Sequence, residues 1–136
     1  MDESITEGPR PFVMDSIQVS YGNRSMPSAA IRIVKQDGTV VDEAAVGNGS
    51  VDAVYQAISK ATGINVELDD YSIHSVTHGA DAQGEVHVVI KQGEQTASGR
   101  GVSTDIVEAS AKAYLEAINR LVHHQERERE GNIVIQ

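Results

Sequence analysis

The hydrophobic and polar positions of this chain repeat one order of elements twice. Patterns typical of strands with a buried face cover 14–21, 29–35 and 39–46 in the first half, and 66–77, 85–91 and 95–98 in the second. A helical spacing of apolar residues follows each set, from Val51 to Ala61 and from about Thr104 to Val122. The sequence therefore predicts an α+β protein of two βββα units related by a pseudo-twofold.

Local signals place the ends of these elements. Asp37-Gly38 is typical of a hairpin between two strands. Ser50 offers a hydroxyl as the N-cap of the first helix, and Gly63 is placed to end it in a left-handed conformation. Asp105 and Glu108 fall in the first turn of the second helix, where the helix dipole favours a negative charge.

A glycine motif occurs in both halves, as Gly47-Asn48-Gly49 and as Gly99-Arg100-Gly101. We expect each to be a turn that opens a helix, where free backbone N–H groups attract anions. A single turn of this kind is more often structural, because glycine reaches backbone conformations that other residues avoid. The duplication favours a shared pocket for a carboxylate, although an old duplication would preserve turn geometry as well.

The organisation along the chain is simple. We expect 1–11 to be a disordered lead-in, 12–63 and 64–122 to be the two units of one domain, and 123–136 to be a charged tail. The acidic start of the chain is unlike a signal peptide and suggests a piece of a longer protein. Apolar surface left over by two small units predicts a homodimer.

The amino-acid composition argues against several classes of function. The 136 residues carry a formal charge of −9, which argues against binding nucleic acid or an anionic membrane. The chain has no cysteine, so disulfides and thiolate chemistry are excluded. It also has no apolar run of the ~20 residues that span a bilayer. We expect a cytoplasmic location.

No group of residues in the sequence points to catalysis. His74 and His78 lie on a strand-like stretch, where their spacing does not make a zinc pair. The acidic residues near Asp69 and Glu85 lack the spacing of a calcium loop. Neither glycine motif has the further glycine or lysine of a nucleotide-binding loop. We therefore predict no catalytic residue, no metal site and no cofactor, and rank a small free-standing enzyme last.

Four segments together carry a resemblance to a known protein family: Gly47–Ala53, Asp70-Tyr71, Gly79–Val86 and Gly99–Ser110. Over about 12–122 the chain closely resembles the C-terminal regulatory domain of 2-isopropylmalate synthase. That enzyme is an acyltransferase which commits 2-oxoisovalerate and acetyl-CoA to leucine synthesis. The regulatory domain of citramalate synthase, which senses isoleucine, is similar and remains an alternative.

The resemblance implies a dimeric regulatory module that binds L-leucine at its interface and gives feedback inhibition. The catalytic TIM barrel, with its divalent metal, lies N-terminal in that family and is not in this sequence. The resemblance implies an effector pocket of Gly47, Asn48, Gly49, Val51, Asp52, Leu68, Tyr71, Ser75, Ala82, Val102, Ser103 and Thr104. Some family members have proline at the position of Thr104 and alanine at that of Ser75, so this chain departs from them at two positions of the implied pocket.

A zwitterionic amino acid needs donors, an acceptor and an apolar slot. Helix-start N–H groups can supply the donors, and Asp52 or turn carbonyls can supply the acceptor.

Leucine and isoleucine differ in the position of one methyl group, and an apolar pocket discriminates between two such ligands by only ~1–3 kcal/mol. The other alternative is a dimerisation domain without a ligand. A Gly101→Val change is expected to remove binding and leave the fold intact.

Overall fold

The computed structural model describes residues 10–21, 26–78 and 81–135. The first unit consists of β1 Phe12–Ser20, β2 Ser28–Lys35, β3 Val40–Val46 and α2 Ser50–Thr62. The second consists of β4 Glu67–His78, β5 Asp81–Gln92, β6 Gln95–Ser103 and α3 Ile106–Ile135. The predicted lead-in lies outside the described residues except for Arg10 and Pro11.

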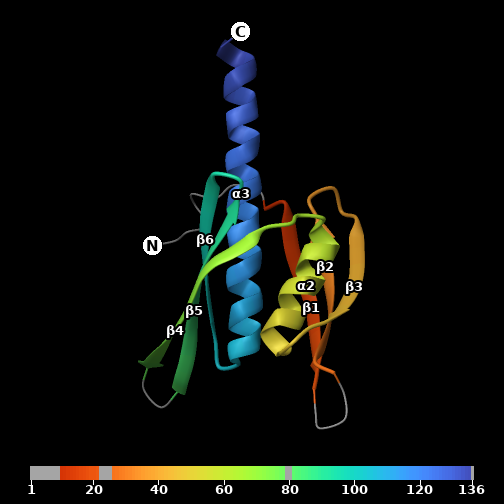
Figure 1. Ribbon diagram of the computed structural model, residues 1–136, viewed down its shortest axis with the longest axis vertical. Helices are drawn as coiled ribbons and strands as arrows, with labels where there is room; N and C mark the ends of the chain where they lie inside the picture. Colours follow the sequence, from red (N-terminus) through yellow and green to blue (C-terminus); the bar gives the residue numbers. More distant parts are fainter. Residues whose placement is uncertain (1–9, 22–25, 79–80, 136) are drawn as a thin grey trace.

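Each unit is an antiparallel three-stranded sheet followed by a helix, in the orders β1-β2-β3 and β4-β5-β6. The prediction of two βββα units is therefore confirmed. Each helix packs on the sheet of its own unit, and the two helices contact each other. Both helices begin at the same end of the molecule, near the end of the β4–β5 hairpin (Figure 1).

Aliphatic side chains form the core between the sheets and the helices. In β2, burial alternates, so that Ala29, Ile31 and Ile33 face α2 and the residues between them face outward. The largest fully buried apolar side chains are Ile33, Ile58, Ile90, Ile118, Leu121, Val54, Val86 and Val88. Within the described residues, no helix combines the length and hydropathy needed to cross a bilayer.

The second glycine motif is not a turn, and that prediction was wrong. β6 continues through Gly99 and Gly101 to Ser103. A Cβ atom on Gly99 would lie 2.0 Å from the carbonyl oxygen of Ala113, and one on Gly101 would lie 2.2 Å from that of Ala109. The two glycines therefore let the backbone of α3 approach the backbone of β6.

The helix ends are partly as predicted. Gly49, not Ser50, is the N-cap of α2, and no side chain caps this end, so the prediction for Ser50 was wrong. Gly63 ends the helix with φ +74°, and its N–H donates to the carbonyl of Ser59 at 2.8 Å, as predicted.

The last helix is longer than its apolar stripe. α3 passes Val122 and continues to Ile135, above the sheets in Figure 1. Gln125 donates to the side chains of Gln92 and Gln95, and Gln95 also donates to Glu128 at 2.8 Å. These bonds attach residues predicted as a tail to the β5–β6 turn. The domain boundaries stay a prediction.

The free edge of β6 is covered by side chains of α3. Glu116 accepts the N–H of Arg100 at 2.7 Å, and Arg120 donates to the carbonyl of Ser98 at 3.2 Å. Lys60 of α2 similarly donates to the carbonyl of Ala44 on β3 at 2.8 Å. Groups satisfied in this way are not available to pair with another strand.

Asn119 joins the last helix to the first strand, and we expect Asn119→Ala to destabilise the protein by about 2 kcal/mol. Its side chain accepts the N–H of Phe12 at 3.0 Å and donates to the carbonyl of Phe12 at 2.9 Å, and both residues are buried. Alanine leaves both backbone groups unsatisfied. Chemical denaturation measures the loss, and Asn119→Asp, which keeps only an acceptor, is the comparison. Equal stability of Asn119→Ala and the unsubstituted chain would contradict this role.

Candidate functional site

The predicted residues of the first glycine motif form a tight turn at the start of α2. The Asp52 carboxylate accepts the N–H of Asn48 at 2.9 Å across this turn. Gly47 has no space for a side chain, because a Cβ would lie 2.5 Å from the backbone nitrogen of Ala53. The turn therefore places a carboxylate beside a helix start whose N–H groups have no side-chain cap.

The start of α3 is built differently. Asp105 accepts the N–H of Val107 at 2.9 Å, so this helix start is capped by its own side chain. Ser103 donates to Glu108 at 2.8 Å and accepts the N–H of Asp105 at 3.1 Å. Since these groups satisfy one another, the start of α3 is less available to an anion than the start of α2.

Predicted residues of the second sheet share its helix-facing side. Tyr71 pairs with Val88 in the ladder, and Val88 is fully buried toward α3. Ser75 pairs with Gly84, which pairs in turn with Ser103, so these three residues form one row across the sheet. Ala82 precedes Gly84 by two positions in β5 and therefore lies on the same side of the sheet.

Part of this side remains open in the single chain. Leu68 and Ile73 of β4 are 45% and 49% exposed, although their ladder partners, Ile90 and Val86, are fully buried. The reason is that α3 packs on β5 and β6, whereas β4 is the outer strand on the other side of β5. An apolar surface is thus available beside Tyr71.

A cluster of tyrosines connects β4 to both helices. Tyr71 donates to or accepts from Ser110 of α3 at 2.8 Å. The ring of Tyr55 on α2 lies edge-on to Tyr71, with centroids 6.4 Å apart, and stacks on Tyr114 of α3 at 4.2 Å. Val51 precedes Tyr55 by one helical turn and is itself partly buried against the core. Through this cluster Tyr71 is close to the start of α2.

Two predicted site residues lie elsewhere. Val102 pairs with Glu85, on the side of the sheet opposite Ser103. It lines a depression of 450 Å³ with His87, Arg100 and Glu116. Thr104 is exposed in the connection between β6 and α3. Val102 and Thr104 therefore do not share the helix-facing side of the sheet with Tyr71 and the Ser75 row, and the grouping of the predicted residues into one pocket stays a prediction.

Sequence reasoning missed the hydrogen bonds of Ser110 and Tyr114 and the ring contacts of Tyr55. Tyr55 and Tyr114 fall within the two helical spacings of apolar residues, which predict only that these side chains face the core. The available signal was a spacing. The first helix carries Tyr55 and Ser59 four residues apart, and the second carries Ser110 and Tyr114 four residues apart in the opposite order. Tyr114 and Ser59 are in fact hydrogen bonded at 2.9 Å.

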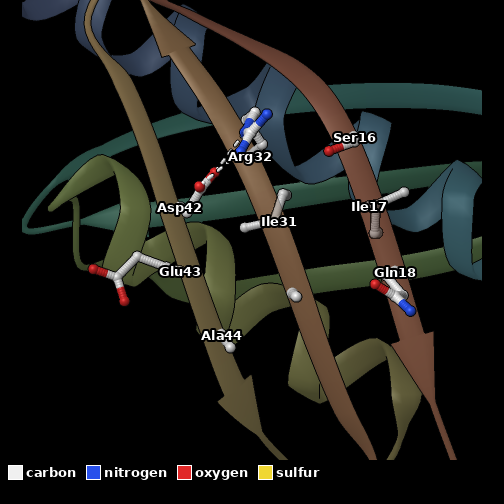
Figure 2. A pocket seen from close by; sticks show the side chains of 9 residues that line it. Ser16, Ile17, Gln18, Ile31, Arg32, Asp42, Glu43 and Ala44 are labelled. Atoms are coloured by element: carbon white, nitrogen blue, oxygen red, sulfur yellow. Dashed lines mark hydrogen bonds and ion pairs between the residues drawn. The ribbon is translucent and has the colours of Figure 1, made fainter.

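The largest of the three described depressions, 620 Å³, contains none of the predicted residues. It lies on the face of the first sheet turned away from the helices (Figure 2). Arg32 donates to Asp42 across it at 2.7 and 2.9 Å, and this hydrogen bond lowers the pKa of Asp42. The other charged residue that lines it, Glu43, lies 3.7 Å from the ammonium group of Lys60, so each charged side chain described around this depression already has a partner of opposite charge.

The outer face of the second sheet carries a charged group around Glu85. This carboxylate accepts from Arg100 and contacts His87 at 3.0 Å, and the bond from Arg100 chiefly lowers its pKa. The His87 ring is edge-on to His74 at 5.5 Å. Among the described residues, no three His, Asp or Glu side chains are placed to hold a metal ion.

The fold thus combines two βββα units, an open strand face on β4 and a start of α2 that no side chain caps. The chain belongs to the LeuA allosteric (dimerisation) domain family, whose model matches residues 1–122. Resemblance to the regulatory domain of 2-isopropylmalate synthase is therefore confirmed.

Proteins named 2-isopropylmalate synthase are similar to it. The one from Brevibacillus brevis is 51% identical over 125 residues, which cover 92% of this chain and 24% of that protein. Those from Shouchella clausii and Carboxydothermus hydrogenoformans are 48% and 47% identical, over 86% and 90% of this chain. The chain spans 23% and 24% of these two proteins. It thus corresponds to about a quarter of such an enzyme.

Proposed function

We propose that this chain is the leucine-binding regulatory domain that gives feedback inhibition of a 2-isopropylmalate synthase. Membership of an allosteric domain family and the names of the relatives support this role. The observation that carries it is the turn at the start of α2, where Asp52 lies beside N–H groups that no side chain caps. A zwitterion needs both a negative group and N–H donors.

The two charges of leucine fit opposite parts of this turn. The ammonium group is attracted by Asp52, because one carboxylate oxygen holds Asn48 and the other has no hydrogen bond among the described residues. The carboxylate is attracted by the first N–H groups of α2, at the positive end of the helix dipole. The side chain then lies toward the exposed apolar surface of β4, which further along this strand includes Ile73.

We further propose that the chain acts as a homodimer, together with the catalytic domain of its parent enzyme. A second copy that covers the open side of β4 would enclose the ligand. Inhibition then requires a coupling free energy between this site and the catalytic domain, typically about 1–3 kcal/mol. The divalent metal belongs to that catalytic domain, and we propose neither a metal nor a cofactor for this chain. A cytoplasmic location remains part of this proposal.

Titration calorimetry and thermal unfolding with leucine, isoleucine and valine test the proposal. Leucine at one hundred times its Kd is expected to stabilise the 136-residue chain by ~2.7 kcal/mol. Isoleucine binding with no response to leucine would favour the citramalate synthase alternative. Absence of heat and of any thermal shift with all three would reject ligand binding, and sedimentation would then show whether a dimerisation role remains.

A further inference from the structure

The free edge of β4 is left uncovered. β4 is an outer strand of its sheet and runs for twelve residues, from Glu67 to His78. In the part of the chain that the structure describes, no hydrogen bond joins the backbone of β4 to a group outside this sheet. Each of the other outer strands of the two described sheets has a backbone group bonded to a helix side chain, at Arg100 and Ser98 of β6, Ala44 of β3 and Phe12 of β1. A long uncovered edge is a template for pairing with another strand.

The same strand has an open apolar side. Leu68 and Ile73 are about half exposed on the side of the sheet where α3 packs. A strand laid along β4 would therefore pair with its edge and cover part of this apolar surface. The charges on β4 favour a second copy of β4 as that strand. The acidic residues lie at its beginning and His74 lies further on, so two antiparallel copies set acid opposite imidazole and keep the acids apart.

We infer that this chain dimerises by antiparallel pairing of β4 with β4 of a second copy, about a twofold axis at Ser72. The inference rests on the homodimer of the proposed function and adds its geometry. A symmetric pair closes on itself, whereas pairing of β4 with a different edge of the second copy would leave edges free for further copies. The product is one six-stranded sheet, with three strands from each copy.

The sequence of β4 favours this register. Asp70 and His74 are exposed on the side of the sheet away from α3, and centring on Ser72 places each directly opposite the other in the second copy. An imidazole donates an N–H to a carboxylate in either of its protonation states. On the α3 side, Tyr71 meets the exposed Ile73, and an aromatic and β-branched pair stabilises antiparallel strands. Centring on His74 would set His74 opposite itself and lose both kinds of pair.

A single cysteine tests the pairing in the 136-residue chain. The sequence has no cysteine, so a thiol at position 72 can form a disulfide only with a second copy. Directly opposite Cα atoms are ~4.5–5.5 Å apart, which a disulfide spans. Ser72→Cys is therefore expected to give a covalent dimer with a mild oxidant, seen by electrophoresis without reductant.

Two further cysteine variants are the matched controls. Thr96→Cys is exposed on β6, at the edge that α3 covers, and is expected to stay largely unlinked. His74→Cys should also stay unlinked, because the two copies of position 74 are ~13 Å apart in this register.

Sedimentation of charge variants tests the register independently. His74→Asp sets two acids opposite each other at two symmetry-related places, so the Kd of the dimer is expected to rise at least about tenfold. Adding Asp70→Lys restores opposite charges, and the Kd should return to within about threefold of that of the unsubstituted chain. His74 also pairs with Glu85 of its own chain and Asp70 does not, so this rescue reports the contact between copies. Thr96→Asp adds the same charge on β6 and should leave the Kd within about twofold.

The outcomes separate the inference from the proposed function. A chain that sediments as a monomer with and without leucine overturns the pairing and the proposed homodimer together. If the chain dimerises but Ser72→Cys links no faster than Thr96→Cys, only the pairing is overturned. Linking through His74→Cys, or no rescue by Asp70→Lys, also overturns it. A dimer that links through Ser72→Cys but gives no heat with leucine supports the pairing and rejects leucine binding.

Discussion

Gly101→Val is expected to destabilise the fold by about 3 kcal/mol, the upper end of the range for overpacking a core. A Cβ at this position lies 2.2 Å from the carbonyl oxygen of Ala109 and 2.8 Å from the nitrogen of Ala113. Both are backbone atoms of α3, so the helix must move away from β6. Thermal unfolding should show a Tm lower by roughly 10 °C. The sequence alone led us to expect an intact fold after Gly101→Val, and the close packing of α3 on β6 replaces this with an expected loss of stability.

Gly49→Val is the matched control for stability. A Cβ on Gly49 meets no atom within 4 Å, and its φ of −158° is extended backbone that valine adopts readily. The Tm of Gly84→Val should fall between those of Gly101→Val and Gly49→Val, because its Cβ meets the end of the flexible Ile106 side chain rather than backbone. If Gly101→Val and Gly49→Val unfold at the same temperature, the close approach of α3 to β6 is refuted.

The different outcomes for the two glycine motifs show where sequence reasoning stops. Strands and helices were predicted correctly where apolar residues recur with a clear period, as in β2 and α2. A glycine that forms a turn and one that admits a helix backbone look the same in a sequence. Gly47 precedes the bend that leads into α2 and Gly99 lies inside β6, yet at both positions a Cβ would meet the backbone of the neighbouring helix, α2 for Gly47 and α3 for Gly99.

The candidate site was predictable to the same degree. The start of α2 follows from a local motif, so its residues were found together. The side on which Val102 lies depends on its ladder partner, Glu85, and the strand was expected to end before it. The Tyr71–Ser110 bond joins residues 39 positions apart, and the Ser59–Tyr114 bond joins residues 55 apart. Such contacts depend on how the two units pack together, and this packing cannot be predicted from a local sequence pattern.

Gly47→Ala is expected to weaken leucine binding at least tenfold, a loss of ~1.4 kcal/mol. Its Cβ would lie 2.5 Å from the nitrogen of Ala53 and 2.6 Å from the carboxylate oxygen of Asp52. Relieving these contacts opens the turn and breaks the bond between Asp52 and the N–H of Asn48. The acceptor for the ligand ammonium then moves away from the helix-start N–H groups. Calorimetric titration with leucine measures the change.

Because the added methyl also strains the first turn of α2, affinity must be compared below the unfolding temperature of the variant. Gly49→Ala adds the same methyl two residues later in open space, and its Tm shows what a methyl costs where nothing is displaced. Asp52→Asn separates geometry from charge, since its amide oxygen can still accept from Asn48. If Gly47→Ala binds leucine as tightly as the unsubstituted chain, the turn is only a corner of the fold. If Asp52→Asn alone loses affinity, the charge rather than the shape of the turn recognises the ligand.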